Sequence, residues 1–468
     1  MASDPRPTFA TSSNRATPAL LDRERLQRLM AGELERFSAG HPGSRALHQR
    51  AMASLVGGVP MPWMARWPGG YPIYVQEARG ARITDVDGHQ YVDLCLGDTG
   101  AMTGYSPAAV VWAVQSQIER GITTMLPSID SIVVAEEMTR RFRVGHWQFT
   151  LSATDANRTA LRIARQITGR PKILVFSYSY HGTVDETFAI RTADGTTRSR
   201  PGNVGPAVNP AVTTRAVEFN NLAQLEQALS DHQVACVLAE PAMTNMGIVL
   251  PDAGYHAALR TLTCRHGTLL IIDETHTFSA GPGGCTQAWG LEPDLLTIGK
   301  ALGSGVPCGA LGLSAHVLER LGQQHDADYE DTGGVGGTLA GNALAAAAMR
   351  ATLEQVLTPQ AFERMIALAS SLRESVERLI EAEQLPWNVT QLGCRVEYSF
   401  LPQPARDGSS AHAGADRELE SYLHLYLLNR GVLITPFHNM VLISPATTPA
   451  DLEQHGHHFA AAIKELFG

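Results

Sequence analysis

Two short apolar runs decide the fold of this chain, Leu269-Leu270-Ile271-Ile272-Asp273-Glu274 and Leu295-Leu296-Thr297-Ile298-Gly299-Lys300. Each run ends at an ionisable residue, and Lys300 follows Asp273 by 27 positions. Short, continuously apolar runs are typical of strands buried in a parallel sheet. Because open α/β sheets bind ligands at the carboxyl ends of their strands, Asp273 and Lys300 are predicted to face one crevice.

An amine and a carboxylate placed in this way suit pyridoxal phosphate. The amine forms a Schiff base, and the carboxylate holds the pyridine nitrogen protonated. The chain has only three lysines, Lys172, Lys300 and Lys464, whereas 34 of its 37 basic residues are arginine. Arginine cannot replace lysine in this chemistry because it stays protonated and is not a nucleophile. On spacing alone, the alternative is a surface lysine that happens to follow a strand.

The bulk composition is that of an ordinary soluble enzyme. The 468 residues can bury a large core and form two or three domains, with 44% hydrophobic and 18% charged residues. A net charge of −9 argues against a nucleic-acid or anionic-membrane partner. No apolar run approaches the length of about 18 residues that a membrane span needs. The polar first 45 residues contain no secretory signal, so a cytoplasmic location is expected.

The cysteines show no spacing typical of metal ligands. We therefore expect free thiols in a reducing compartment and no metal site. The six positions are Cys95, Cys236, Cys264, Cys285, Cys308 and Cys394.

Four segments are expected along the chain: a tail and helix (1–45), the N-terminal part of a small domain (46–100), a large domain (101–340) and the rest of the small domain (341–468). Residues 1–20 are expected to be loosely attached, and helical periodicity covers Leu20 to Phe37. Residues 71–96 alternate around Asp87-Gly88 and predict a hairpin or meander. Because the glycine is at the wrong offset for a calcium loop, Asp85 and Asp87 are interpreted as turn residues.

The large segment alternates strands with helices, which predicts an α/β fold with a mostly parallel sheet. Residues 341–468 mix helices with short strands, which predicts a smaller α+β domain. The expected helices are Pro107–Glu119, Ser131–Arg141 and Arg158–Thr168, and the expected strands are Ile173–Phe176, Ala235–Ala239, Leu269–Asp273, Leu295–Gly299 and Ala310–Leu313.

Four further segments carry side chains that suit a flat phosphorylated cofactor. Residues 152–157 precede a helix, and small residues there present free N–H groups to a phosphate; an ordinary capping box is the alternative. Tyr180 follows a strand and could stack on a ring, while His181 is either a base or a structural residue. Glu240 ends another strand, and its alternative is a loop carboxylate paired with an arginine. Thr338 closes a glycine-rich stretch, residues 331–338, that is either a second phosphate contact or a linker.

A loop rich in proline and glycine, residues 56–70, carries Trp63 and Trp67. Its aromatic residues either pack against the body of the protein or form one wall of an apolar substrate pocket.

In this order the segments resemble the class III (ω-type) aminotransferases of pyridoxal-phosphate fold type I. The nearest similarity is to the branch that contains glutamate-1-semialdehyde aminomutase and β-amino-acid aminotransferases, and it covers roughly residues 45–465. The segments are ITDVDGHQYVDLCLG (83–97), SATDANRTALRIARQITGR (152–170), YHG (180–182), AEPAMTNMGIVLP (239–251), GTLLIIDE (267–274), PDLLTIGKALGSGVPCGALG (293–312) and GGTLAGNALAAAA (336–348).

The resemblance implies a role for each matching residue. Lys300 would form the Schiff base and shuttle the substrate proton, and Asp273 would pair with the pyridine nitrogen. Tyr180 would stack on the ring. The remaining cofactor contacts would be Ala153 and Thr154 at the phosphate, Thr338 at the phosphate of the partner subunit in a homodimer with shared sites, and Glu240 in the hydrogen-bond network around the ring.

Several positions depart from the family pattern. Ser152-Ala153-Thr154-Asp155 stands for S-G-T-E, Thr275 replaces a valine that packs on the ring, and Ala280 replaces an arginine. Trp63 matches the position of a carboxylate-binding arginine, with Arg66 nearby. Together with Trp67 these residues are the expected substrate pocket, which favours an amine or amino acid with a bulky apolar or aromatic side.

The reaction expected from the resemblance is ping-pong transamination between an amino donor and a keto acceptor such as pyruvate or 2-oxoglutarate. The same residues would serve an aminomutase, which moves the amino group within one molecule. A third alternative is a catalytically silent dimeric scaffold, against which the retention of Asp273 and Lys300 argues. A nucleotide-binding dehydrogenase is disfavoured because no G-x-G-x-x-G opens a βαβ unit.

Overall fold

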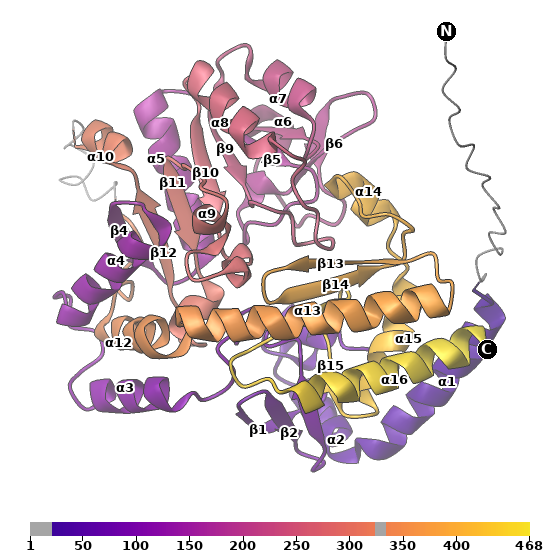
Figure 1. The fold of residues 1–468 in the computed structure, drawn as a ribbon. Helices are drawn as coiled ribbons and strands as arrows, with labels where there is room; N and C mark the ends of the chain where they lie inside the picture. Colours follow the sequence, from indigo (N-terminus) through magenta and orange to yellow (C-terminus); the bar gives the residue numbers. More distant parts are fainter. Residues whose placement is uncertain (1–20, 323–333) are drawn as a thin grey trace, which may run out of the picture.

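The large domain is built around a seven-stranded sheet in the order β4–β12–β11–β10–β9–β5–β8, in the upper part of Figure 1. The computed structural model describes residues 21–322 and 334–468, so the expectations for residues 1–20 and 331–333 lie outside it. The strands are β4 (His146–Thr150), β5 (Lys172–Phe176), β8 (Thr214–Val217), β9 (Val234–Ala239), β10 (Leu269–Asp273), β11 (Leu295–Ile298) and β12 (Gly309–Leu313).

Helices cover both faces of this sheet, as the continuously apolar strands require. In β10, Leu269 and Ile271 join the cluster under α5 (Ala153–Thr168). Leu270 and Ile272 join the opposite cluster, under α7 (Leu222–Leu229) and α8 (Tyr255–Arg265). Successive strand residues point to opposite faces, so a strand that is apolar at every position is buried on both sides.

Strand β12 departs from the parallel pattern, because it runs antiparallel to both β11 and β4. The strands β5, β8, β9, β10 and β11 are parallel to their neighbours in that set. Only ten residues separate Ile298 from Gly309, and a parallel crossover needs a dozen or more. The chain therefore turns back directly after Lys300.

The small domain lies below this sheet in Figure 1 and contains two sheets, β1–β2–β3–β15 and β13–β14–β16. The predicted hairpin is present as β2 paired with β3 around Gly88. The strands are β1 (Val75–Arg79), β2 (Arg82–Asp85), β3 (Gln90–Asp93), β13 (Asn388–Leu392), β14 (Arg395–Ser399), β15 (Val432–Leu433) and β16 (Met440–Leu442). Its helices are α1 (Arg23–Gly40), α2 (Pro42–Ala51), α13 (Pro359–Ala382), α14 (Gly408–Ala413), α15 (Arg417–Leu428) and α16 (Pro449–Phe467).

The remaining elements connect these layers. The helices are α3 (Ala108–Ile118), α4 (Ile129–Phe142), α6 (Pro210–Thr213), α9 (Gly284–Ala288), α10 (Ala315–Leu321) and α12 (Ala343–Ala351). The short turns are η1 (Val56–Gly58), η2 (Pro62–Ala65), η3 (Asp185–Thr187), η4 (Thr277–Ala280), η5 (Lys300–Gly303) and η6 (Thr352–Val356), and the strands β6 (Ala189–Arg191) and β7 (Thr197–Ser199) form a separate ribbon.

One core cluster crosses the expected domain division. It joins Phe278 and Leu296 of the large domain to Leu372 of α13 and Tyr422 of α15. Such a continuous core fixes how the two domains sit against each other. The predicted domain boundaries stay a prediction. All six cysteines are unpaired. Within the described ranges, no helix is both long and apolar enough to cross a membrane.

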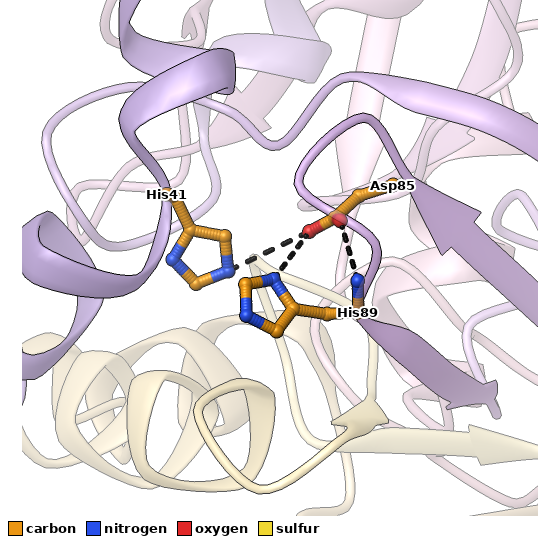
Figure 2. A group of neighbouring side chains, drawn as sticks. All are labelled: His41, Asp85 and His89. Atoms are coloured by element: carbon orange, nitrogen blue, oxygen red, sulfur yellow. Dashed lines mark hydrogen bonds and ion pairs between the residues drawn. The ribbon is translucent and has the colours of Figure 1, made fainter.

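A buried carboxylate ties the N-terminal helices to the hairpin. Figure 2 shows His41 and His89 approaching Asp85. Asp85 Oδ1 accepts the backbone N–H of Asp87 and of His89 at 3.0 and 2.9 Å, and the hydroxyl of Tyr91 donates to Oδ2 at 2.7 Å. The ligand atoms of His41, Asp85 and His89 lie within 4.8 Å of one another, but each is hydrogen-bonded within the protein. The sequence-based expectation of no metal site stays a prediction.

We expect Asp85→Ala to lower the free energy of unfolding by about 3 kcal/mol or more. The change leaves the N–H groups of Asp87 and His89 without this acceptor, at about 1–3 kcal/mol each, and removes the bond from the Tyr91 hydroxyl, which keeps only its contact with His41 Nε2 at 2.8 Å. Urea denaturation measures the loss. The control is His89→Ala, whose side chain is 44% exposed and should cost about 1 kcal/mol. Equal losses in the two variants would contradict this account of the network.

Candidate active site

Asp273 and Lys300 lie at the same edge of the large sheet. Asp273 is the last residue of β10 and pairs with Thr297 of the parallel neighbour β11. Lys300 opens the turn η5 two residues after β11 ends. Both side chains therefore leave the carboxyl ends of adjacent strands, where open α/β sheets bind their ligands.

Asp273 is a fully enclosed carboxylate with three partners. His181 Nδ1 lies 3.0 Å and Asn157 Nδ2 2.9 Å from its Oδ2, and the backbone N–H of Thr275 donates to Oδ1 at 3.0 Å. Burial alone would raise the pKa of Asp273, but the hydrogen bond and charge of His181, with the other two donors, hold this pKa below its ordinary value. The carboxylate is thus kept ionised, and His181 is a positioning residue for it.

Lys300 has two close partners that the sequence analysis did not identify. Its Nζ lies 2.7 Å from Asp98 Oδ2 and 2.7 Å from His276 Nε2. His276 Nδ1 in turn lies 3.0 Å from Thr99 Oγ1 and 3.2 Å from Nη1 of the buried Arg395. The only signal for Asp98 is a carboxylate in the short segment Gly97-Asp98-Thr99-Gly100 after a strand, and His276 follows Asp273 by three positions. Neither pattern is specific.

The N-terminus of α5 forms a cradle for an anion. Ser152 caps the helix, since its Oγ accepts the N–H of Asp155, and the helix starts at Ala153, five residues before the expected start. In the described part of the chain no acceptor contacts the N–H of Ala153 or Thr154. Gly182 closes the cradle, because a Cβ there would lie 2.0 Å from Thr154 Oγ1. The Ser152 cap and the phosphate site are therefore compatible, and the reciprocal bond of a full capping box, from the Ser152 N–H to Asp155, is not observed among the described residues.

Aromatic side chains surround Tyr180 near this edge. Its ring centroid lies 5.4 Å from that of Trp63, which lies 5.7 Å from that of Phe437. The guanidinium of Arg66 lies over Phe437 at 5.5 Å. Trp63 and Arg66 thus stand beside the residue expected to stack on the cofactor.

Two expected site residues lie elsewhere. Trp67 packs against the small-domain cluster that contains Phe37 and Tyr91, which is the packing alternative for this loop. Thr338 is exposed in a turn before α12, and no hydrogen bond among the described residues joins it to the other site residues. Its expected role at a partner subunit stays a prediction.

Glu240 follows β9 at the same edge and is buried. The hydroxyl of Thr244 donates to its Oε2, while Oε1 has no partner among the described residues. Burial raises the pKa of Glu240 to about 7, against the opposing charge of His181. No arginine pairs with it in the structure, so the ion-paired loop carboxylate is not observed.

The chain belongs to the class III aminotransferases, whose family model matches residues 63–463. It is 32% identical to a glutamate-1-semialdehyde 2,1-aminomutase of Anaeromyxobacter sp. (strain Fw109-5), over 90% of this chain and 98% of that protein. A solved glutamate-1-semialdehyde aminomutase from Pseudomonas aeruginosa PAO1 has 47% identity and a TM-score of 0.92, covering 95% and 99% of the two chains. A β-phenylalanine aminotransferase from Variovorax paradoxus has 26% identity and a TM-score of 0.83, covering 94% and 97%.

The cofactor of this family is pyridoxal 5′-phosphate, and the fold is that of type I. The residues of this chain fit it. Lys300 can take the aldehyde, the ionised Asp273 suits the pyridine nitrogen, and the free N–H groups of Ala153 and Thr154 suit the phosphate.

We expect Glu240→Gln to change the free energy of unfolding of the cofactor-free protein, relative to the parent, more favourably at pH 8 than at pH 4.5. An ordinary glutamate pKa is near 4.5, and that of Glu240 in the folded protein is about 7. The contribution of Glu240 to the stability of the parent protein is therefore fully present below pH 4.5 and is lost as the pH rises to about 7. The variant should gain about 3 kcal/mol over this range, at about 1.4 kcal/mol per pH unit. Guanidinium denaturation at both pH values tests this, and a pH-independent difference would refute it.

Proposed function

We propose that the protein is an aminotransferase that moves an amino group between an amine or amino acid with a bulky apolar or aromatic side and a keto acid. The observation that carries the proposal is a lysine at the same sheet edge as an ionised, triply hydrogen-bonded Asp273, just beyond the end of the adjacent strand. Membership of the class III family supports the reaction class.

Each residue has a definite task in this reaction. When bound, pyridoxal phosphate supplies the carbonyl that captures an amine and the electron sink that stabilises negative charge on the substrate carbon. Asp273 holds the proton of the ring nitrogen in place, and His181 and Asn157 keep Asp273 oriented and charged. Lys300 would be the linkage to the bound cofactor, and its amine, when free, would be the base that carries the substrate proton.

The aromatic cluster supports a bulky apolar substrate. Trp63, Tyr180 and Phe437 form an apolar wall beside the cofactor site. One structural neighbour is named a β-phenylalanine aminotransferase, which is consistent with an aromatic amino acid as donor.

Aminomutase activity is the second candidate, favoured by the names of similar proteins at 32% and 47% identity. An aminomutase needs the same lysine, aspartate and cofactor, but it needs no separate amino acceptor. Dependence on an added keto acid therefore discriminates between the two activities.

We expect aromatic amino donors to bleach the visible band of the purified holoenzyme, and an added keto acid to restore it. Lys300→Ala should show neither the lysine-linked band nor turnover, because the other two lysines lie elsewhere, Lys172 at the start of β5 and Lys464 in α16. Absorption spectra with a panel of donors measure this, and Lys172→Ala is the matched control on the strand β5. Rapid conversion of glutamate-1-semialdehyde without any acceptor would overturn the transaminase assignment in favour of the aminomutase.

We further propose a homodimer that brings Thr338 to the partner's site. Exposed apolar side chains gather on α3, on α4 and between them, and they adjoin a hollow of about 840 Å³ lined in part by Trp147, Phe149 and Gly337. Monomeric proteins rarely expose so many large apolar residues together. These exposed residues are Trp112, Ile118, Met125, Leu126, Ile129 and Ile132.

We expect Ile129→Glu to shift the protein from dimer to monomer and to weaken retention of the cofactor. Ile129 is 77% exposed in the single chain, so a charge there would have to be buried on dimerisation. Analytical ultracentrifugation and the visible band measure both effects. Val212→Glu, at an exposed apolar residue on α6, should leave the dimer intact, and a monomeric parent protein would refute the proposal.

A further inference from the structure

The amine of Lys300 contacts two groups that are not among the expected cofactor-binding residues. Asp98 Oδ2 and His276 Nε2 each lie 2.7 Å from Nζ. They come from distant parts of the chain, since Asp98 follows β3 and His276 follows β10. The tertiary fold therefore surrounds one nitrogen with a carboxylate and an imidazole.

The turn that carries Asp98 has an unusual backbone. Leu96, Asp98 and Thr99 have φ values of 48°, 51° and 79°, in the left-handed region that side chains rarely adopt. Such conformations persist only where the surrounding structure imposes them. The turn aims the Asp98 carboxylate at Lys300, and its second oxygen, Oδ1, is buried with no partner among the described residues.

Several charged groups face Asp98. Burial alone would raise the pKa of Asp98, but the charge of Lys300 foremost, with that of Arg395, keeps this pKa well below its ordinary value; the imidazoles of His276 and His438 also face the carboxylate. The carboxylate is therefore ionised. Glu397 lies on the far side of the cluster, hydrogen-bonded to His438 at 2.6 Å.

His276 has a partner for either of its neutral tautomers. With its proton on Nδ1 it can donate to Thr99 Oγ1, and its Nε2 then accepts from a lysine ammonium. With its proton on Nε2 it donates to a neutral lysine amine, and Nδ1 accepts from Arg395, which can only donate. Burial and the charges of Lys300 and Arg395 lower the pKa of His276 and keep the ring neutral, while Asp98 and Asp273 oppose this.

We propose that Asp98 is the counter-ion of the Lys300 nitrogen, and that His276 is a positioning residue that accommodates this nitrogen with or without its proton. This inference deepens the proposed function and rests on it. The Asp98 carboxylate, 2.7 Å from Nζ, is placed to pair with a positive charge on this nitrogen when the lysine is linked to the cofactor. A lysine that substrate has displaced would find a carboxylate and an imidazole arranged to hold it close by, ready to take up and release a proton.

The test is a pH titration of the visible band of the holoenzyme without substrate. Asp98→Asn and Asp98→Gly both remove the charge, and both residues tolerate a φ near +51° better than other replacements. The midpoint of this titration is the pH at which the Lys300 nitrogen linked to the cofactor loses its proton. Because a neighbouring opposite charge changes a pKa by about 1–3 units, each variant should lower this midpoint by at least about one pH unit, a tenfold loss of proton affinity.

The matched control is Asp294→Asn. Asp294 is a buried aspartate that precedes β11 at the opposite end and pairs with Arg260 at 2.7 Å. The midpoint of the Asp294→Asn variant should stay at the parent value. A shift common to all three variants would reflect a general loss of structural stability and would overturn the proposal. Unchanged midpoints in both Asp98 variants would also overturn it. Because the titration needs no substrate, its outcome is independent of whether the proposed transamination occurs.

His276→Phe tests the positioning role. If the imidazole serves the proton transfer of Lys300, the variant should increase the isotope effect on kcat with an α-deuterated donor, since proton transfer becomes slower relative to the other steps. The KM of the donor should change little. A variant with lower kcat but an unchanged isotope effect would show that His276 only supports the structure.

Discussion

The parallel pairing of β10 with β11 is the constraint on which the rest of the site depends. Their register places Asp273 opposite Thr297, three residues before Lys300, and backbone hydrogen bonds prevent one strand from sliding past the other. Helix α5 packs across the same strands, so its free N-terminal N–H groups are fixed relative to both side chains. The side chain of Asn157 on α5 completes the link, because it bonds both Asp273 and Thr297.

Hydrogen-bond donors decide which of the two buried carboxyl groups at this edge, Asp273 and Glu240, is ionised. Asp273 has donors on both oxygens and stays ionised, whereas Glu240 has one hydroxyl donor and a pKa near 7. Both are buried, so burial does not explain the difference; the number and charge of the hydrogen-bond donors do. The chain thus provides a negative charge at the expected position of the ring nitrogen and, at the same edge, a carboxyl group that changes its charge near pH 7.

The relatives share the fold and the cofactor but are named for different reactions. In such a family the scaffold does not decide which reaction takes place, and the residues around the reacting atoms do. In this chain we expect those residues to include Asp98 and His276 beside Lys300, Arg395 beside His276, Trp63 beside Tyr180, and Phe437 beside Trp63. We expect these residues to decide which substrate this protein accepts.

The sequence by itself determined the class of the fold, the central strands, the hairpin and the pair Asp273 and Lys300. These features depend on local patterns: continuous apolar runs, alternation around a glycine, and ionisable residues at strand ends. The sequence did not reveal that β12 runs antiparallel, because the length of a short connection limits the topology only when both strands are already known.

Only the tertiary structure decided the surroundings of Lys300. Asp98 and His276 lie 202 and 24 residues from it, and Arg395 comes from a third part of the chain. No periodicity or spacing links such positions, since side chains distant in sequence meet only when separate elements pack together. The same holds for the two tryptophans of the loop. Trp63 packs against Tyr180 and Trp67 against the small-domain core, because packing of the whole loop, not residue type, sets the direction of each side chain.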